Sequence, residues 1–111
     1  MASFRVGESV KMKKGTMDAE YEKWDLSGWQ GWVVATPKRG QRDTYQILWD
    51  TNTFKNMPVD FIAQANEDHD EWDVYYTVAE ELETAFAKDT MRDAEKIAKE
   101  WRAKYPREEE D

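Results

Sequence analysis

The chain has 111 residues, with 24 Asp and Glu against 16 Lys and Arg, a net charge of −8 and no cysteine. This length favours one small domain, and the lack of cysteine excludes a disulfide framework, a thiolate zinc site and a thiol nucleophile. No apolar run approaches the ~20 residues that cross a bilayer, and no basic segment followed by an apolar core opens the chain. We therefore expect a cytoplasmic, soluble protein without membrane contact.

Charge is distributed unevenly along the chain. Residues 1–42 hold eight basic and five acidic residues, a balance of +3, whereas residues 43–111 hold eight basic and nineteen acidic residues, a balance of −11. A negative field repels phosphate backbones at long range. Nucleic acid is therefore disfavoured as a partner, although a local basic strip remains compatible with it.

The first part of the chain alternates apolar and polar residues in short runs. Val10 and Met12 fall on one side of a predicted strand, with lysines on the other. A polar connection then leads to Gly28 and Gly31, which indicate a sharp turn or a close approach of two backbones.

A hairpin follows these glycines. Residues 32–36 are rich in β-branched and aromatic side chains, which suit a half-buried sheet. The polar loop 38–43 separates this strand from a second one over residues 45–50.

The middle of the chain is less regular. We expect a short strand over residues 53–55 and a single helical turn beginning at Pro58. Residues 66–71 read as a solvated acidic loop. Residues 74–78 have the composition of a closing strand, although their spacing also fits a helix, and a helical turn is expected around residues 80–83.

The last predicted element is an amphipathic helix over residues 91–105. Thr90 is a suitable N-cap and Asp93 occupies the matching capping-box position. Apolar residues recur at helical spacing on one side. Pro106 ends the helix, and the charged residues that follow are expected to be disordered.

The order of glycines and strands is similar to that of a known class of small barrel. The segments VGESV (residues 6–10), DLSGWQGWVV (residues 25–34) and YQILWD (residues 45–50) resemble the GD-x-V-x-V, G-x-x-G-x-V and V-x-W strands of SH3-like barrels. The barrel of the variable subunit of ferredoxin–thioredoxin reductase is the most similar, and KOW and Tudor barrels are more distant. The resemblance covers roughly residues 4–78, and barrels of this kind share a fold without sharing a function.

This resemblance implies a mainly β protein with a C-terminal α-helix: an SH3-like, five-stranded antiparallel barrel followed by one amphipathic helix. We expect the barrel over residues 1–78, a connecting segment over 79–89, the helix over 90–105, packed on or beside the barrel, and an acidic disordered tail over 106–111.

Aromatic residues are the main functional signal. Because Val33 shares a face with Gly31 and fills the barrel, Trp32 is expected to point outward. An exposed aromatic surface commonly marks a contact site for a protein or peptide. The alternative is that the stripe of the last helix, which includes Trp101, covers this surface. The candidate partner-binding residues are Tyr21, Trp24, Trp29, Trp32, Tyr45 and Trp49.

Two charged clusters offer weaker signals. A basic strip is a possible phosphate-binding surface, or a solvated face; its members are Lys11, Lys13, Lys14, Lys38, Arg39 and Arg42. The acidic run around His69 lacks the central glycine of calcium loops and offers only one imidazole. We therefore expect no metal, no cofactor and no catalytic residues.

These observations favour a non-catalytic protein-interaction module or accessory subunit that recognises a basic or proline-rich protein or peptide through an exposed aromatic surface. One alternative is a nucleic-acid-associated, KOW-like barrel that uses the basic strip. Another is a small-molecule pocket lined by tryptophans between barrel and helix.

Overall fold

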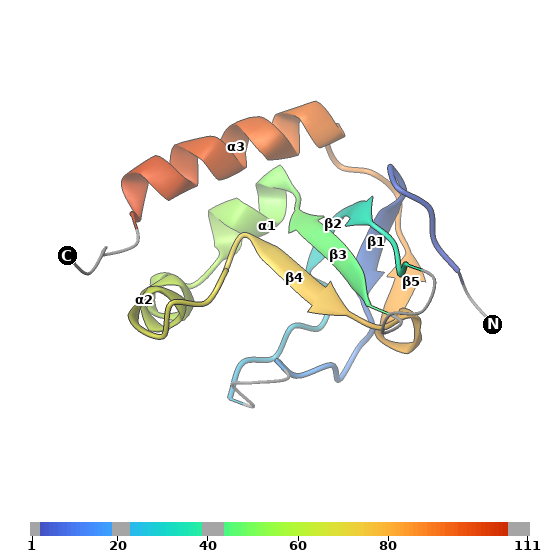
Figure 1. Ribbon diagram of the computed structural model, residues 1–111, viewed down its shortest axis with the longest axis horizontal. Coiled ribbons are helices and arrows are strands. Elements are labelled where there is room, and N and C mark those ends of the chain that lie inside the picture. The colour runs from blue at the N-terminus through green and yellow to red at the C-terminus, as the bar shows by residue number, and fades with distance from the viewer. Residues whose placement is uncertain (1–2, 19–22, 39–43, 107–111) are drawn as a thin grey trace.

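The structure is a computed structural model that describes residues 3–18, 23–38 and 44–106. It contains five strands, three α-helices and one 3-10 turn (Figure 1). In chain order these are β1 (Ser9–Met12), β2 (Gln30–Ala35), β3 (Tyr45–Trp49), α1 (Thr51–Asn56), α2 (Val59–Glu67), β4 (Val74–Thr77), the 3-10 turn η1 (Ala79–Glu81), β5 (Leu82–Thr84) and α3 (Met91–Lys104).

The five strands form one antiparallel sheet in the order β4-β3-β2-β1-β5. The first strand therefore pairs with the last, and Met12 lies opposite Leu82. Within the described residues β4 and β5 are the two outer strands and do not pair with each other. The fold is thus an open, β-rich sheet with helices, and the closed barrel that we expected is not observed.

The two faces of the sheet differ because side chains that lie opposite each other on neighbouring strands share a face. On the inner face, Val10, Val33 and Ile47 are buried in the core. On the outer face, Trp32 lies opposite Leu48, and Leu48 lies opposite Val74. Trp32 therefore projects from the outer face of the sheet.

Gly31 lies in β2 in close contact with β3. A Cβ added at this position would lie 2.3 Å from the Leu48 carbonyl oxygen and 2.8 Å from the Ile47 Cγ2 atom. Only a residue without a side chain fits this contact. The close approach indicated by the glycine pattern is confirmed here.

The segment after β3 is helical, and the strand predicted over residues 53–55 is wrong. Asp50 directly follows β3 and is the N-cap of α1. Its Oδ1 atom accepts a hydrogen bond of 2.8 Å from the Thr53 backbone N–H. Phe54 then turns into the core and is fully buried. The single turn expected at Pro58 is the longer helix α2, which buries Phe61 and Ile62.

The segment between β4 and α3 also contains more structure than we expected. The predicted helical turn is the 3-10 turn η1. It is followed directly by β5, which pairs with β1 along residues 82–84. Leu82 is buried there against the core, and the pairing with β1 makes β5 an outer strand of the described sheet.

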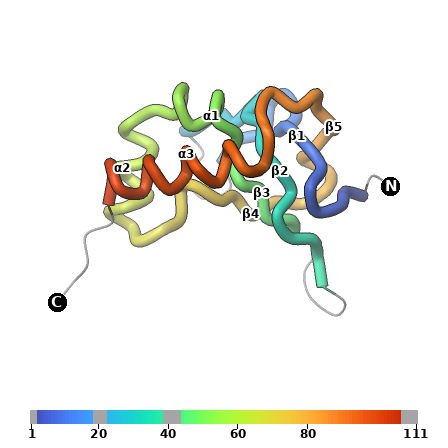
Figure 2. Tube along the Cα trace, turned by 90° about the horizontal axis from the view of Figure 1, so that it is seen from above, coloured from blue at the N-terminus to red at the C-terminus, as the bar shows by residue number. Residues whose placement is uncertain are grey.

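Helix α3 covers part of the outer face, with the capping box between Thr90 and Asp93 in place. It runs along α1 and over β2 and β3, as Figure 2 shows from above. Ala94, Ile97 and Ala98 are its buried residues. The amphipathic helix predicted from the sequence is confirmed, and its apolar stripe serves the protein's own core. Of the tail expected to be disordered, residues 106–111, the part over 107–111 lies outside the described residues.

Candidate functional site

The predicted aromatic residues do not form one exposed surface. Tyr45 and Trp49 are buried in the core, and the Tyr45 hydroxyl accepts a hydrogen bond from the Phe4 backbone N–H. Trp24 and Trp29 are half-buried and make edge contacts with the same ring, that of Phe61. Tyr21 lies outside the described residues. The expectation of a single exposed aromatic surface is therefore corrected, because Tyr45 and Trp49 are buried and the half-buried Trp24 and Trp29 pack against the core.

Trp32 points outward as expected but is half-buried at the edge of α3. Its Nε1 atom donates a hydrogen bond of 2.8 Å to Asp89 Oδ1, just before the helix begins. The other oxygen of Asp89 accepts hydrogen bonds from the backbone N–H and the hydroxyl of Thr51. Trp32 thus helps to hold α3 and α1 on the sheet.

The predicted basic strip is divided by the fold. Lys11 lies opposite Gln30, where β2 begins, whereas Lys38 follows the far end of β2. Lys11 is also paired with Glu83, with 3.5 Å between its Nζ and the carboxylate oxygen. Lys13 and Lys14 are exposed near Lys11. Arg39 and Arg42 lie outside the described residues. The lysines that the structure does place therefore leave no continuous cationic strip.

Across residues 3–18, 23–38 and 44–106, no group of three or more His, Asp or Glu side chains is placed to hold a metal ion. None of the helices in these ranges is long and apolar enough to cross a membrane.

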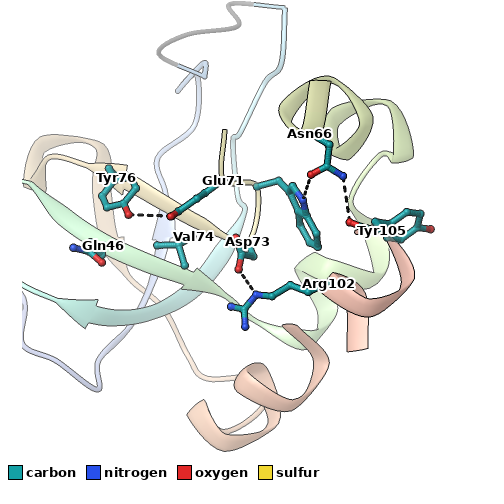
Figure 3. Close-up of a pocket in the computed structure, with 9 residues that line it drawn as sticks. Gln46, Asn66, Glu71, Asp73, Val74, Tyr76, Arg102 and Tyr105 are labelled. Atoms are coloured by element: carbon teal, nitrogen blue, oxygen red, sulfur yellow. Dashed lines mark hydrogen bonds and ion pairs between the residues drawn. The ribbon is translucent and has the colours of Figure 1, made fainter. Parts of the chain in front are cut away.

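A hollow of the described structure lies on the outer face of β4. It has a volume of about 590 Å³ and lies between this strand, the end of α2 and the C-terminal part of α3 (Figure 3). We call it the outer hollow. Its lining combines aromatic and charged side chains, among them Glu71, Trp72, Asp73, Tyr76, Arg102 and Tyr105.

A second hollow, of about 360 Å³, opens on the other side of the same strand. We call it the inner hollow, because Tyr75 of the inner face and Phe61 of α2 line it together with Asp70. Glu71, Trp72, Val74 and Tyr76 belong to both hollows. Strand β4 therefore forms a ridge with a depression on either side.

The hydrogen-bond register gives the direction of the β4 backbone groups. The Trp49 N–H donates to the Asp73 carbonyl at 3.4 Å, so Asp73 directs its backbone groups toward β3. Since these groups alternate along an antiparallel strand, Tyr75 and Thr77 also face β3. Val74 and Tyr76 therefore present their N–H and C=O groups to the side away from β3, where the described sheet has no further strand.

Polar contacts organise the outer hollow (Figure 3). Arg102 of α3 forms an ion pair with Asp73. Asn66 joins the two walls, because its Oδ1 atom accepts a hydrogen bond from Trp72 Nε1 and its Nδ2 atom donates to the Tyr105 carbonyl. These contacts fix the end of α3 beside β4.

Tyr76 stands at the mouth of the outer hollow, where it is 49% exposed. Its hydroxyl donates a hydrogen bond of 3.0 Å to Glu71 Oε2. Partial burial raises the pKa of the Tyr76 phenol above its usual value, and the hydrogen bond and the negative charges of Glu71 and Asp73 raise it further. Two carboxylates, those of Glu71 and Asp73, thus lie close enough to the phenol to affect its ionisation.

Sequence reasoning missed this site. It treated residues 66–71 as a solvated loop and residues 74–78 as an ambiguous strand. The aromatic residues Trp72, Tyr75 and Tyr76, which follow the acidic run within five residues, were a usable signal, since aromatic rings bind cations. Arg102 lines the outer hollow only because of the path of α3, and no pattern in the neighbouring sequence indicates this position.

Comparison with known proteins gives no relative for this chain: no family model, no curated protein and no solved structure matches it.

Proposed function

We propose that this protein is a non-catalytic interaction module, or accessory subunit, that binds an extended basic peptide along β4. The peptide adds to the sheet as a further strand. One structural relationship supports this proposal: β4 is an outer strand and has a hollow on each of its faces.

Backbone pairing provides the affinity in this mode of binding. The outward-facing N–H and C=O groups of Val74 and Tyr76 match the spacing of an antiparallel or parallel partner strand. An outer strand of this kind is a template for a further chain unless its edge is blunted. The charged residues next to β4 limit self-association and favour a partner of opposite charge.

Side-chain pockets provide the selectivity. Successive residues of an extended peptide point to opposite faces, so alternate side chains reach the outer and the inner hollow. The carboxylates of Glu71 and Asp70 at these hollows, together with the net charge of −8, favour basic side chains. The half-buried rings of Tyr75 and Tyr105 supply apolar contact area for the same peptide.

We also propose that the sheet is an SH3-like fold. Pairing of the first strand with the last, and a 3-10 turn between β4 and β5, support this relation. In that architecture the peptide would extend the sheet at the end opposite β5.

A synthetic seven-residue peptide of alternating valine and threonine, with arginine at its centre, tests the proposal. We expect the amide resonances of Val74 and Tyr76 to shift in an NMR titration and their hydrogen exchange to slow. Residues of β5, at the opposite end of the sheet, provide the internal control and are expected not to shift.

A matched peptide separates strand addition from attraction by charge alone. Methylation of the backbone nitrogens that face β4 keeps every side chain and the charge but removes the donors of the ladder. We expect this peptide to bind at least tenfold more weakly. Equal binding of both peptides, or shifts confined to residues away from β4, would contradict the proposal.

A further inference from the structure

We infer that the outer hollow is a specificity pocket for one arginine side chain of the bound peptide. This inference rests on the proposed function and adds the chemical identity of the residue that the pocket recognises. It concerns the space between Tyr76, Glu71 and the C-terminal part of α3 (Figure 3).

The register of an added strand directs a side chain into this hollow. A peptide residue directly opposite Tyr76 or Val74 lies on the same face of the sheet as these residues. Both belong to the outer face, because Gln46 lies opposite Tyr76 and Leu48 lies opposite Val74. The two peptide neighbours of that residue point to the inner hollow instead.

The walls of the outer hollow suit a planar cation. The rings of Tyr76, Trp72 and Tyr105 line it, and a guanidinium group stacks on aromatic faces more readily than an ammonium group does. Tyr76 is the most accessible of the three rings. Its hydroxyl donates a hydrogen bond to Glu71, which brings the ring and the carboxylate together at the hollow.

The carboxylates retain capacity for a bidentate donor. Glu71 accepts a hydrogen bond from the neutral Tyr76 hydroxyl, whereas a carboxylate offers about four acceptor sites. Among the described residues that line the hollow, Arg102 is the only cation, and it pairs with Asp73 rather than with Glu71. Glu71 is therefore the carboxylate that a peptide guanidinium would meet.

Arg102 shows how one guanidinium lies beside a carboxylate of the hollow. Its Nε atom contacts Asp73 Oδ2 while the rest of its side chain stays half-exposed. The site thus already holds one guanidinium between a carboxylate and α3. A second guanidinium, supplied by the peptide at Glu71, repeats this arrangement at the mouth of the hollow.

Three matched peptides test the inference. Each is the alternating valine–threonine peptide used above, with arginine, lysine or citrulline at its centre; citrulline keeps the planar shape and loses the charge. We expect the arginine peptide to bind about tenfold more tightly than the citrulline peptide and severalfold more tightly than the lysine peptide, as measured by calorimetry. The E71Q variant is expected to remove most of the arginine preference, and E67Q, which changes an exposed residue at the end of α2, is expected to retain it.

The outcomes separate the inference from the proposed function. Equal affinity of the three peptides, with the Val74 and Tyr76 amides still shifting, would overturn the arginine pocket and leave strand addition in place. An arginine preference that persists in full in E71Q would also overturn it, since residues other than Glu71 would then recognise the arginine side chain of the peptide. If no peptide shifts the β4 amides, both proposals fail. Thermal unfolding of E71Q verifies that the variant is folded.

Discussion

Trp32 and Asp89 are joined by a hydrogen bond of 2.8 Å from the indole Nε1 to the carboxylate Oδ1. The second oxygen of Asp89 receives the Thr51 backbone N–H at 2.9 Å and its hydroxyl at 2.6 Å. One carboxylate therefore links β2, the start of α1 and the segment before α3. Removing this carboxylate leaves three hydrogen-bond donors without their acceptor. Asp89 is therefore a main contact that holds α1 and α3 on the sheet.

We predict that Asp89→Ala lowers the free energy of unfolding by about 2 kcal/mol, because hydrogen bonds to a charged acceptor are stronger than neutral ones. Chemical denaturation measures this loss. Glu95→Ala, on the exposed side of α3, is the control and should change stability by less than about 0.5 kcal/mol.

A double-mutant cycle with Trp32→Phe isolates the bond itself. Phenylalanine keeps most of the packing and lacks the indole N–H. The combined variant should lose less stability than the two single losses together, since both remove the same interaction. Strict additivity would mean that the Trp32–Asp89 hydrogen bond contributes nothing in solution.

Gly31 supplies the second prediction. A methyl group at this position would meet the Leu48 carbonyl oxygen at 2.3 Å, and backbone atoms cannot yield as a flexible side chain can. Gly31→Ala should therefore destabilise the protein by about 3 kcal/mol, the upper range for overpacking. Gly28→Ala is an informative comparison. A Cβ added at Gly28 would meet open space, but the residue has a φ of +79°. Gly28→Ala should therefore lower the free energy of unfolding by about 1 kcal/mol.

Ile97 tests the role of α3 as part of the core. It is buried where the helix crosses the sheet and α1. Replacing it by alanine should cost about 3 kcal/mol through lost apolar contact and the cavity left behind. Thermal or chemical unfolding measures the effect, with Lys96→Ala as an exposed neighbour for comparison. A negligible loss would imply that the stripe of α3 serves another partner.

The parts of the fold that are determined by a few neighbouring residues were predictable from the sequence. The capping box at Thr90, the alternation around Val10 and the glycine at position 31 each report a constraint within a few residues of themselves. Residues 51–67 lack such a signal, because Phe54 and Phe61 fit several interpretations. Their helices follow from where β3 ends and from the Asp50 cap, which is recognisable only once that end is known.

The site was less accessible to sequence reasoning than the fold. That β4 is an outer strand depends on β5 pairing with β1, a contact between distant parts of the chain. The single exposed aromatic surface predicted from the sequence does not form among the described residues, because the burial of Trp49 and the partner of Trp32 are properties of the tertiary structure. Arg102 reaches the outer hollow only because α3 ends beside β4.

The last prediction concerns the titration of Tyr76. Partial burial raises its pKa above the ordinary value of 10.0, and the hydrogen bond to Glu71 and the charges of Glu71 and Asp73 act in the same direction. The folded protein therefore holds the phenol proton more tightly than the unfolded chain does. The contribution of Tyr76 to stability is complete below the unfolded pKa, near pH 10, and is lost as the pH rises through the raised pKa.

Glu71→Gln removes the carboxylate charge but keeps an oxygen that can accept the hydrogen bond. We expect the Tyr76 pKa to fall toward its ordinary value without reaching it, because the burial that is the largest cause remains. A titration of the tyrosine ring carbon signals by NMR measures the change, and Glu95→Gln on the far side of α3 should leave it unaltered. An unchanged Tyr76 pKa in the Glu71→Gln variant would mean that the two side chains do not meet in solution. The pairing of the Tyr76 ring with a carboxylate, on which the proposed recognition of an arginine side chain depends, would then be absent.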